Sequence, residues 1–164
     1  MPKRNIYFDF GYLLSLAVVL GGVLTLGAIV APVIFHSDAY TVGMMLDHYN
    51  MGIVMGEIFR RFAYVVYFIV IYVLVYESYM YKIMQIDKIA ILSAFGVVFS
   101  GLLFSAVYVP KILEFQKLGA KATQSDTFAN IHTASEIDFK ILAVALAILF
   151  VRRLMLLPMG RKTQ

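Results

Sequence analysis

Four residues between the first two apolar stretches of the chain have side chains suited to a soft metal ion. They are spaced by four, three and four residues, which would place them along one side of a helix: Met44, His48, Met51 and Met55. Thioether and imidazole groups suit Cu(I). The alternative is that the methionines fill gaps on the apolar side of a helix at the membrane surface. The pattern predicts a site for copper or a metal complex and leaves the packing interpretation open.

A second group of polar residues has a helical spacing further along the chain. His132, Glu136 and Lys140 are each four residues apart, and Ser135 lies between the first two. Ionisable side chains inside a membrane-spanning helix usually face the interior of the bundle or a water-filled cavity. The alternative is an ordinary helix end whose charges reach the lipid headgroups.

A third group of charged residues directly precedes a long apolar run. Glu57 can pair with Arg61 one helical turn later, which leaves Arg60 on a neighbouring face. An arginine that turned inward would meet His132 and could hold an anionic group, whereas one that turned outward would anchor the helix at the membrane surface. We expect a polar cluster at the outer mouth of the protein, formed by Glu57, Arg60, Arg61, His132, Ser135, Glu136 and Lys140.

The elements that carry these residues follow from the apolar content of the chain. Of its 164 residues, 62% are hydrophobic and only 15% are charged, and the mean hydropathy is +0.84. A soluble domain of this size needs more charge to cover its surface. The apolar residues also come in continuous runs rather than in alternation, and in lipid such runs form helices, because a helix satisfies its own backbone. The sequence predicts an all-α integral membrane protein.

Four spans are expected in a single membrane domain that covers residues 1–164. The last apolar run, Ile141–Val151, is too short for a hydrocarbon core that needs about 20 residues. Some of the polar residues before it are therefore expected in the outer part of the fourth span, out of Lys140, Asp138, Glu136, Ser135 and His132. Short amphipathic helices are expected at the outer face, in residues 36–61 and 110–135. The predicted fold is a four-transmembrane-helix bundle with spans at about 10–35, 62–79, 89–109 and 133–152.

The distribution of positive charge predicts the orientation of the chain. If the N-terminus is inside, eight of the 14 lysines and arginines lie on the inner side and six on the outer side. Membrane proteins carry their excess of positive charge in the inner segments. We therefore expect both termini in the cytoplasm. The net charge of +4 gives no basic domain that could bind nucleic acid.

The composition and the motifs exclude several kinds of site. The chain contains no cysteine, which rules out disulfides, thiolate zinc sites, iron–sulfur clusters and covalent haem attachment. A metal ion or haem would need histidine, methionine, carboxylate or tyrosine ligands. No nucleophile elbow, phosphate-binding loop, zinc-protease pair or dinucleotide fingerprint is present. The sequence gives no positive indication of an enzyme.

Three short segments resemble a known family. Ala31–Phe35, Gly52–Phe62 and Ile131–Ser135 are similar to the bacterial members of an uncharacterised four-span family. That family is grouped with human transmembrane protein 205 and, more distantly, with CopD-like copper-resistance membrane proteins. The chain departs from the family where an asparagine usually follows the serine, because Asp138 and Phe139 occupy that region. The motif residues implied by the resemblance are Pro32, Phe35, Gly52, Gly56, Arg61, His132 and Ser135.

The resemblance implies a small four-helix bundle in the bacterial inner membrane, and the kinship with CopD suggests copper or haem handling. Together with the residues above, it leaves three functions open. The first is binding or moving copper or a metal complex at the outer face. The second is an accessory or structural subunit of a larger respiratory or transport complex, whose partners would be the bilayer, further copies of the chain or other subunits. The third is a haem or porphyrin protein, which requires His132 to point inward.

Overall fold

The computed structural model describes residues 5–40 and 46–157, and this part of the chain is almost entirely helical and contains no strand. The long helices are α1, Ile6–Thr25; α3, His48–Lys82; α4, Lys88–Leu102; and α7, Asp126–Met155. The short helices are α2, Ala31–Phe35; α5, Val109–Lys117; and α6, Ala120–Thr123. A π-helical segment, Leu26–Val30, joins α1 to α2, and a second one, Leu103–Tyr108, joins α4 to α5. A 3₁₀ turn, Ser37–Ala39, follows α2.

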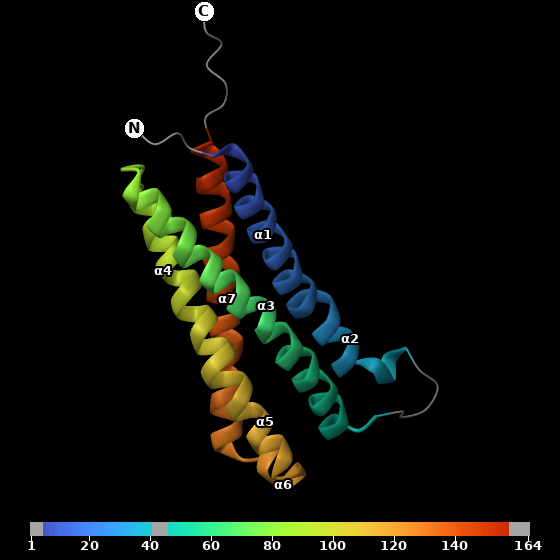
Figure 1. The fold of residues 1–164 in the computed structure, drawn as a ribbon. Coiled ribbons are helices and arrows are strands. Elements are labelled where there is room, and N and C mark those ends of the chain that lie inside the picture. The colour runs from blue at the N-terminus through green and yellow to red at the C-terminus, as the bar shows by residue number, and fades with distance from the viewer. Residues whose placement is uncertain (1–4, 41–45, 158–164) are drawn as a thin grey trace, which may run out of the picture.

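The four long helices form one bundle (Figure 1). The helix α1 packs against α3 and α7, and α4 packs against the same two helices, so α1 and α4 lie at opposite corners. The start of α1 and the end of α7 meet at one end of the bundle, which we call the terminal end. The opposite end, with α2, α5 and α6, is the distal end. The prediction of an all-helical fold is confirmed.

Each long helix begins at a residue whose side chain caps it. Four side chains accept a hydrogen bond from a backbone N–H in the first turn of their helix: Asn5, Asp47, Asp87 and Ser125. These N–H groups have no partner within the helix, so each cap stabilises the helix start by about 1 kcal/mol. The caps thus fix where the long helices begin.

Glycines let the helices approach closely within the bundle. A Cβ atom at Gly101 of α4 would lie 2.7 Å from Val70 of α3, and one at Gly22 of α1 would lie 2.8 Å from Phe62 of α3. Small residues at such positions are typical of helix contacts in membranes, where close packing holds the helices together. The contacts of α3 with its two neighbours therefore depend on these glycines.

Three helical stretches are long and apolar enough to cross a membrane: Ile6–Phe35, His48–Lys82 and Lys88–Lys117. In addition, all four long helices expose large apolar side chains, for example Leu14, Phe68, Phe95 and Val144. Soluble monomers rarely expose apolar surface on this scale. These faces suit contact with a lipid bilayer, so the chain is a helical membrane protein. The helix α7 is not among the three stretches.

Two helices extend further at the distal end than predicted. The helix α3 begins at His48 rather than near residue 62, and α5 follows α4 without a break through the π-helical segment Leu103–Tyr108. Residues 48–61 therefore extend the second span, and the prediction of a separate short helix there was wrong, whereas α5 and α6 are short helices within or next to the predicted range 110–135. Gly52 and Gly56 are poor helix formers, so the sequence did not indicate a helix at residues 48–61. In the structure both glycines lie against the side chain of Gln116 in α5, and this contact supports the longer α3.

Candidate functional site

The contact between α4 and α7 contains a buried carboxyl group. The side chain of Asp138 in α7 is only 6% exposed, and the hydroxyl of Ser100 in α4 lies next to its carboxyl. Its Oδ2 atom has no hydrogen-bond partner among the described residues. A buried polar atom without a partner costs folding free energy, about 1 to 3 kcal/mol in typical proteins. Asp138 is therefore a residue whose position calls for an explanation.

Three serine hydroxyls lie in the same contact, and together with Asp138 they form what we call the Asp138 site. Ser100, Ser105 and Ser135 are all less than a tenth exposed. Ser135 donates a hydrogen bond to the carbonyl oxygen of His132, at 2.7 Å. The Ser105 hydroxyl, in the π-helical segment after α4, is the other buried side-chain atom in the described residues that has no partner. Both unpaired atoms thus occur where α4 and its extension pack on α7.

Aromatic side chains of α3, of α7 and of the π-helical segment Leu103–Tyr108 form a cluster. Phe139 of α7 packs on Phe104, with ring centroids 4.9 Å apart, and Phe59 of α3 makes edge contacts with both rings. These rings bring no hydrogen-bonding groups and exclude water. The cluster begins at Phe139, the residue directly after the buried Asp138, and burial among apolar groups raises the cost of holding a charge.

The terminal end holds a second buried polar group, in which the charges are paired. Arg153 of α7, only 2% exposed, donates two hydrogen bonds to Glu77 of α3, one of them at 2.9 Å from Nε. The hydroxyl of Tyr12 donates to the same carboxylate at 3.2 Å, and that of Tyr76 donates to Asp9 at 2.6 Å. The rings of Tyr12 and Tyr76 are stacked 3.7 Å apart. This group joins α1, α3 and α7.

A further ion pair ties α7 to the start of α4. Arg152 donates two hydrogen bonds to Asp87, at 2.9 and 2.6 Å. Hydrogen bonding from Arg152 lowers the pKa of Asp87 from its ordinary value of 3.8 to about 2. Asp87 is also the N-cap of α4. Both arginines at the end of α7 thus bind carboxylates that lie outside α7.

The predicted soft-metal residues differ in how far their side chains are exposed. Met51 and Met55 are buried, whereas His48 is exposed, with its ring 5.5 Å from that of Phe35. Met44 lies outside the described residues. No group of three or more histidines, aspartates and glutamates in the described part of the chain could hold a metal ion. Methionine is not among these residue types, so a copper site at these residues stays a prediction.

The predicted charged residues of α3 pair with one another on its exposed side. Glu57 accepts hydrogen bonds from Arg60 and from Arg61, with shortest distances of 2.6 and 2.8 Å. All three side chains are more than 40% exposed. Both guanidinium groups therefore bind within α3 rather than facing the helix that carries His132.

The predicted residues of α7 lie on two different faces. His132 and Glu136 are partly exposed and 3.4 Å apart, and Lys140 is exposed. Ser135 and Asp138, in contrast, belong to the buried face. The sequence could have revealed this second face, because these two residues continue a helical spacing that ends in the buried residues Leu142, Leu146, Leu149 and Arg153. The functional candidates that the sequence reasoning missed are Ser100, Ser105, Glu77 and Arg153.

The comparison with protein families matches residues 14–121 to the family described as Domain of unknown function (DUF4149). The chain belongs to this uncharacterised family. The match ends before α7, so Asp138 lies beyond the matched range. No curated protein and no solved structure matches the chain. The expectation of an uncharacterised family is confirmed, whereas links to human transmembrane protein 205 or to CopD are not shown and stay predictions.

Proposed function

We propose that this member of the DUF4149 family is a four-span membrane protein that binds and releases a proton at Asp138, inside the membrane. The observation that supports this is the buried carboxyl of Asp138, one oxygen of which has no partner among the described residues. Ionisable groups within membrane helices are costly, and they commonly serve proton relays and ion pathways. Proton binding gives Asp138 a role that packing alone does not explain.

The surroundings of Asp138 favour a neutral acid over a carboxylate. A carboxylate in an apolar interior needs a cation or several hydrogen-bond donors. Within the described residues Asp138 forms no ion pair, and Ser100 offers one hydroxyl. A bound proton therefore allows α4 and α7 to pack closely at this point. Loss of the proton leaves a charge that water must reach, which favours their separation.

The π-helical segment Leu103–Tyr108 gives the contact a means of changing shape. Such segments are rare and are often found at functional sites. This one contains Ser105, whose hydroxyl is buried without a partner among the described residues. A return to regular α-helical hydrogen bonding would rotate Ser105 and Phe104 relative to α7. We assign the change of shape that accompanies proton release to this segment.

The proposal includes α7 as a fourth span. Its 30 residues give a length of about 45 Å, which exceeds the thickness of the hydrocarbon core. It packs along both α1 and α4, and its ionisable residues Asp138 and Arg153 are buried in the bundle. The chain starts and finishes its long helices at the same end (Figure 1), as an even number of spans requires. Both ends would then lie on the cytoplasmic side of a bacterial inner membrane.

Single cysteines test this topology, because the chain has none of its own. Met84, between α3 and α4, and Leu118, after α5, are both exposed and lie at opposite ends of the bundle. In intact spheroplasts, a membrane-impermeant maleimide should label Leu118→Cys and should label Met84→Cys only after lysis. Labelling of both positions in intact spheroplasts would place Met84 and Leu118 on the same side of the membrane. That result would contradict the proposed arrangement of the spans. The reverse pattern would invert the orientation.

Infrared spectroscopy of the protein in lipid tests proton binding at Asp138. The wild type should show the carbonyl band of a protonated carboxyl group at neutral pH, and the band should titrate with pH. Asp138→Asn should remove this band, because an amide cannot take up the proton. Glu136→Gln is the matched control, since it lies on the same helix but is exposed, and it should leave the band unchanged. A spectrum unaffected by Asp138→Asn would contradict the proposal.

Soft-metal binding is a second candidate, favoured by the burial of Met51 and Met55 one turn apart on α3. The purified protein should then bind Cu(I) stoichiometrically, and replacing both methionines by leucine should abolish binding while keeping the side-chain volume. Met80→Leu, a buried methionine near the terminal end, is the control. Elemental analysis gives the copper content, and an absorbance scan detects haem. An accessory-subunit role and a haem-binding role also stay predictions.

A further inference from the structure

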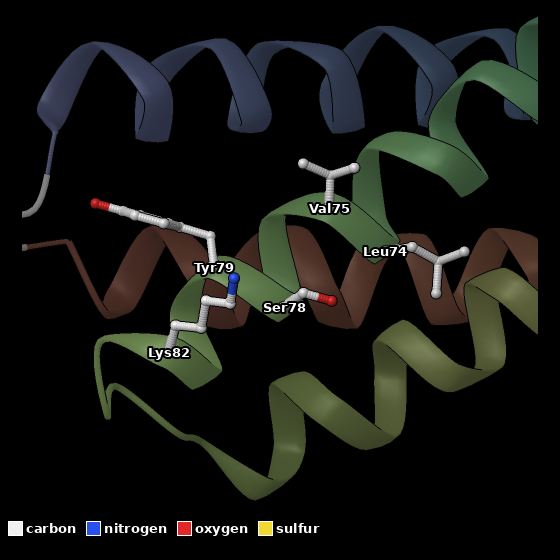
Figure 2. A pocket seen from close by; sticks show the side chains of 5 residues that line it. All are labelled: Leu74, Val75, Ser78, Tyr79 and Lys82. Atoms are coloured by element: carbon white, nitrogen blue, oxygen red, sulfur yellow. The ribbon is translucent and has the colours of Figure 1, made fainter.

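A depression on the outer surface of α3 lies near the terminal end, and Figure 2 shows it between α1 and α4. Its volume is about 450 Å³, and its lining residues all come from one side of α3: Leu74, Val75, Ser78, Tyr79 and Lys82. The depression is open to the surroundings of the bundle, so in a membrane it faces lipid. It is separate from the Asp138 site, which lies between α4 and α7.

The lining changes from apolar to charged along the helix. Leu74 and Val75 come first, the hydroxyls of Ser78 and Tyr79 follow one turn later, and the ammonium group of Lys82 lies in the last turn. Figure 2 shows the Lys82 side chain turned back towards Ser78. From Leu74 to Lys82 the helix rises by about 12 Å. The order of these groups matches that of a phospholipid, from acyl chain to phosphate.

The charge of Lys82 is not neutralised by neighbouring residues. Lys82 is exposed and forms no ion pair within the described part of the chain. The nearest carboxylate along the helix, that of Glu77, is directed into the bundle and pairs with Arg153. The ammonium group is therefore available to an anionic partner outside the bundle.

We propose that this depression binds one anionic phospholipid. An acyl chain lies on Leu74 and Val75, and the phosphate accepts a hydrogen bond from Ser78 and contacts Lys82, whereas Figure 2 shows the Tyr79 hydroxyl directed away from these two groups. A lysine near the membrane surface attracts anionic lipid with an energy that corresponds to roughly a fivefold change in affinity. The site explains why the hydroxyl of Ser78 and the ammonium group of Lys82 lie next to the exposed apolar residues Leu74 and Val75.

Native mass spectrometry of the full chain in detergent tests the site, with phosphatidylglycerol and phosphatidylcholine of identical acyl chains as probes. The wild type should retain one phosphatidylglycerol in preference to phosphatidylcholine. Lys82→Gln should weaken that binding about fivefold. The matched control is Lys88→Gln, which removes an exposed lysine at the same end of the bundle but outside the depression, and it should have no effect.

A second pair of variants tests the acyl-chain part. Val75→Trp fills the depression without touching the charge and should abolish retention of the lipid, whereas Leu92→Trp, at an exposed position of α4, should not. Equal binding of both lipids, or equal loss in Lys82→Gln and Lys88→Gln, would overturn the proposal. Binding of inorganic phosphate with the same affinity as the lipid would also overturn it, since the acyl chain would then contribute nothing. So would a chain dimer that forms through this face and is disrupted by Val75→Trp.

Discussion

Two buried ionisable side chains on one face of α7 have opposite surroundings. Arg153 is paired with Glu77, and its guanidinium lies 5.4 Å from the centre of the Tyr76 ring. Asp138 has one oxygen without a partner among the described residues. The surroundings of Arg153 fix its charge, because removing either partner would leave a buried charge alone. Those of Asp138 favour the neutral acid but offer no cation that would fix a charge, which suits a group that gains and loses a proton.

The Arg153–Glu77 pair should be essential to stability. Arg153→Met should reduce the free energy of unfolding by about 3 to 5 kcal/mol, because Glu77 would stay buried without its cation. Denaturant unfolding in detergent, followed by circular dichroism, measures the loss. Arg61→Met, which removes one of two arginines from the exposed Glu57, should have little effect. Equal losses in the two variants would mean that Arg153 does not join the helices.

The Asp87–Arg152 pair should make stability depend on pH in the acidic range. The folded protein lowers the pKa of Asp87 from 3.8 to about 2, so its contribution is complete above pH 3.8 and disappears as the pH falls through 2. Asp87→Asn should therefore be less stable than the wild type at pH 6 and equally stable near pH 2. Asparagine caps a helix as well as aspartate does, so this variant isolates the ion pair. A difference in unfolding free energy that does not change with pH would contradict this origin.

Among the elements, α7 shows best what could be predicted from sequence. Its apolar half and its polar first half both follow from the residues. The buried face does not, because His132, Glu136 and Lys140 have a helical spacing as regular as that of Ser135, Asp138 and Leu142. Which face is buried depends on where α1 and α4 lie, and this is a property of the bundle.

The same limit applies to the lengths of helices and to long-range pairs. The continuous apolar runs predicted the four long helices, but the start of α3 depends on the contact between Gly56 and Gln116, which are 60 residues apart. The pairs Arg153–Glu77 and Arg152–Asp87 join residues 76 and 65 positions apart. No spacing within one helix could indicate such pairs.

The contact between α3 and α4 predicts a sharp difference between two glycines. Gly101→Ala should destabilise the protein by about 1 to 3 kcal/mol, because the added methyl group would lie 2.7 Å from Val70 and force the helices apart. Gly21→Ala in α1 should be neutral or slightly stabilising, since nothing lies within 4 Å and alanine favours a helix. Thermal unfolding in detergent compares the two. Equal changes in thermal stability for the two variants would show that helix propensity, and not packing, determines the effect.

At the scale of the whole molecule, the two ends of the bundle are held together differently. At the terminal end, arginines of α7 bind carboxylates of α3 and of the start of α4. At the distal end, the Glu57–Arg60 ion pair and the His132–Glu136 contact lie within single helices. The hydrogen bonds between helices there join α3 to α5, through Gln116. The terminal end is therefore the firmer attachment of α7.

This asymmetry should be visible in hydrogen exchange. Amides in the first third of α7, up to Ile137, should exchange faster than those after Leu142, because the later part is held by both arginine pairs and by the buried leucines. Mass spectrometry of peptides from the detergent-solubilised protein measures the two rates. In Asp87→Asn the difference between these two exchange rates should become smaller. Uniform protection along α7 would contradict the asymmetry.

The arrangement of the arginine pairs also has a consequence for synthesis of the protein at the membrane. The carboxylates of Glu77 and Asp87 are translated long before Arg152 and Arg153. While the ribosome is still adding α7, the three earlier helices present two acidic groups towards an open side of the bundle. Such groups are unfavourable in lipid. An unfinished chain thus exposes two unpaired acidic groups that a membrane chaperone or protease can recognise. Pairing with Arg152 and Arg153 ends this exposure.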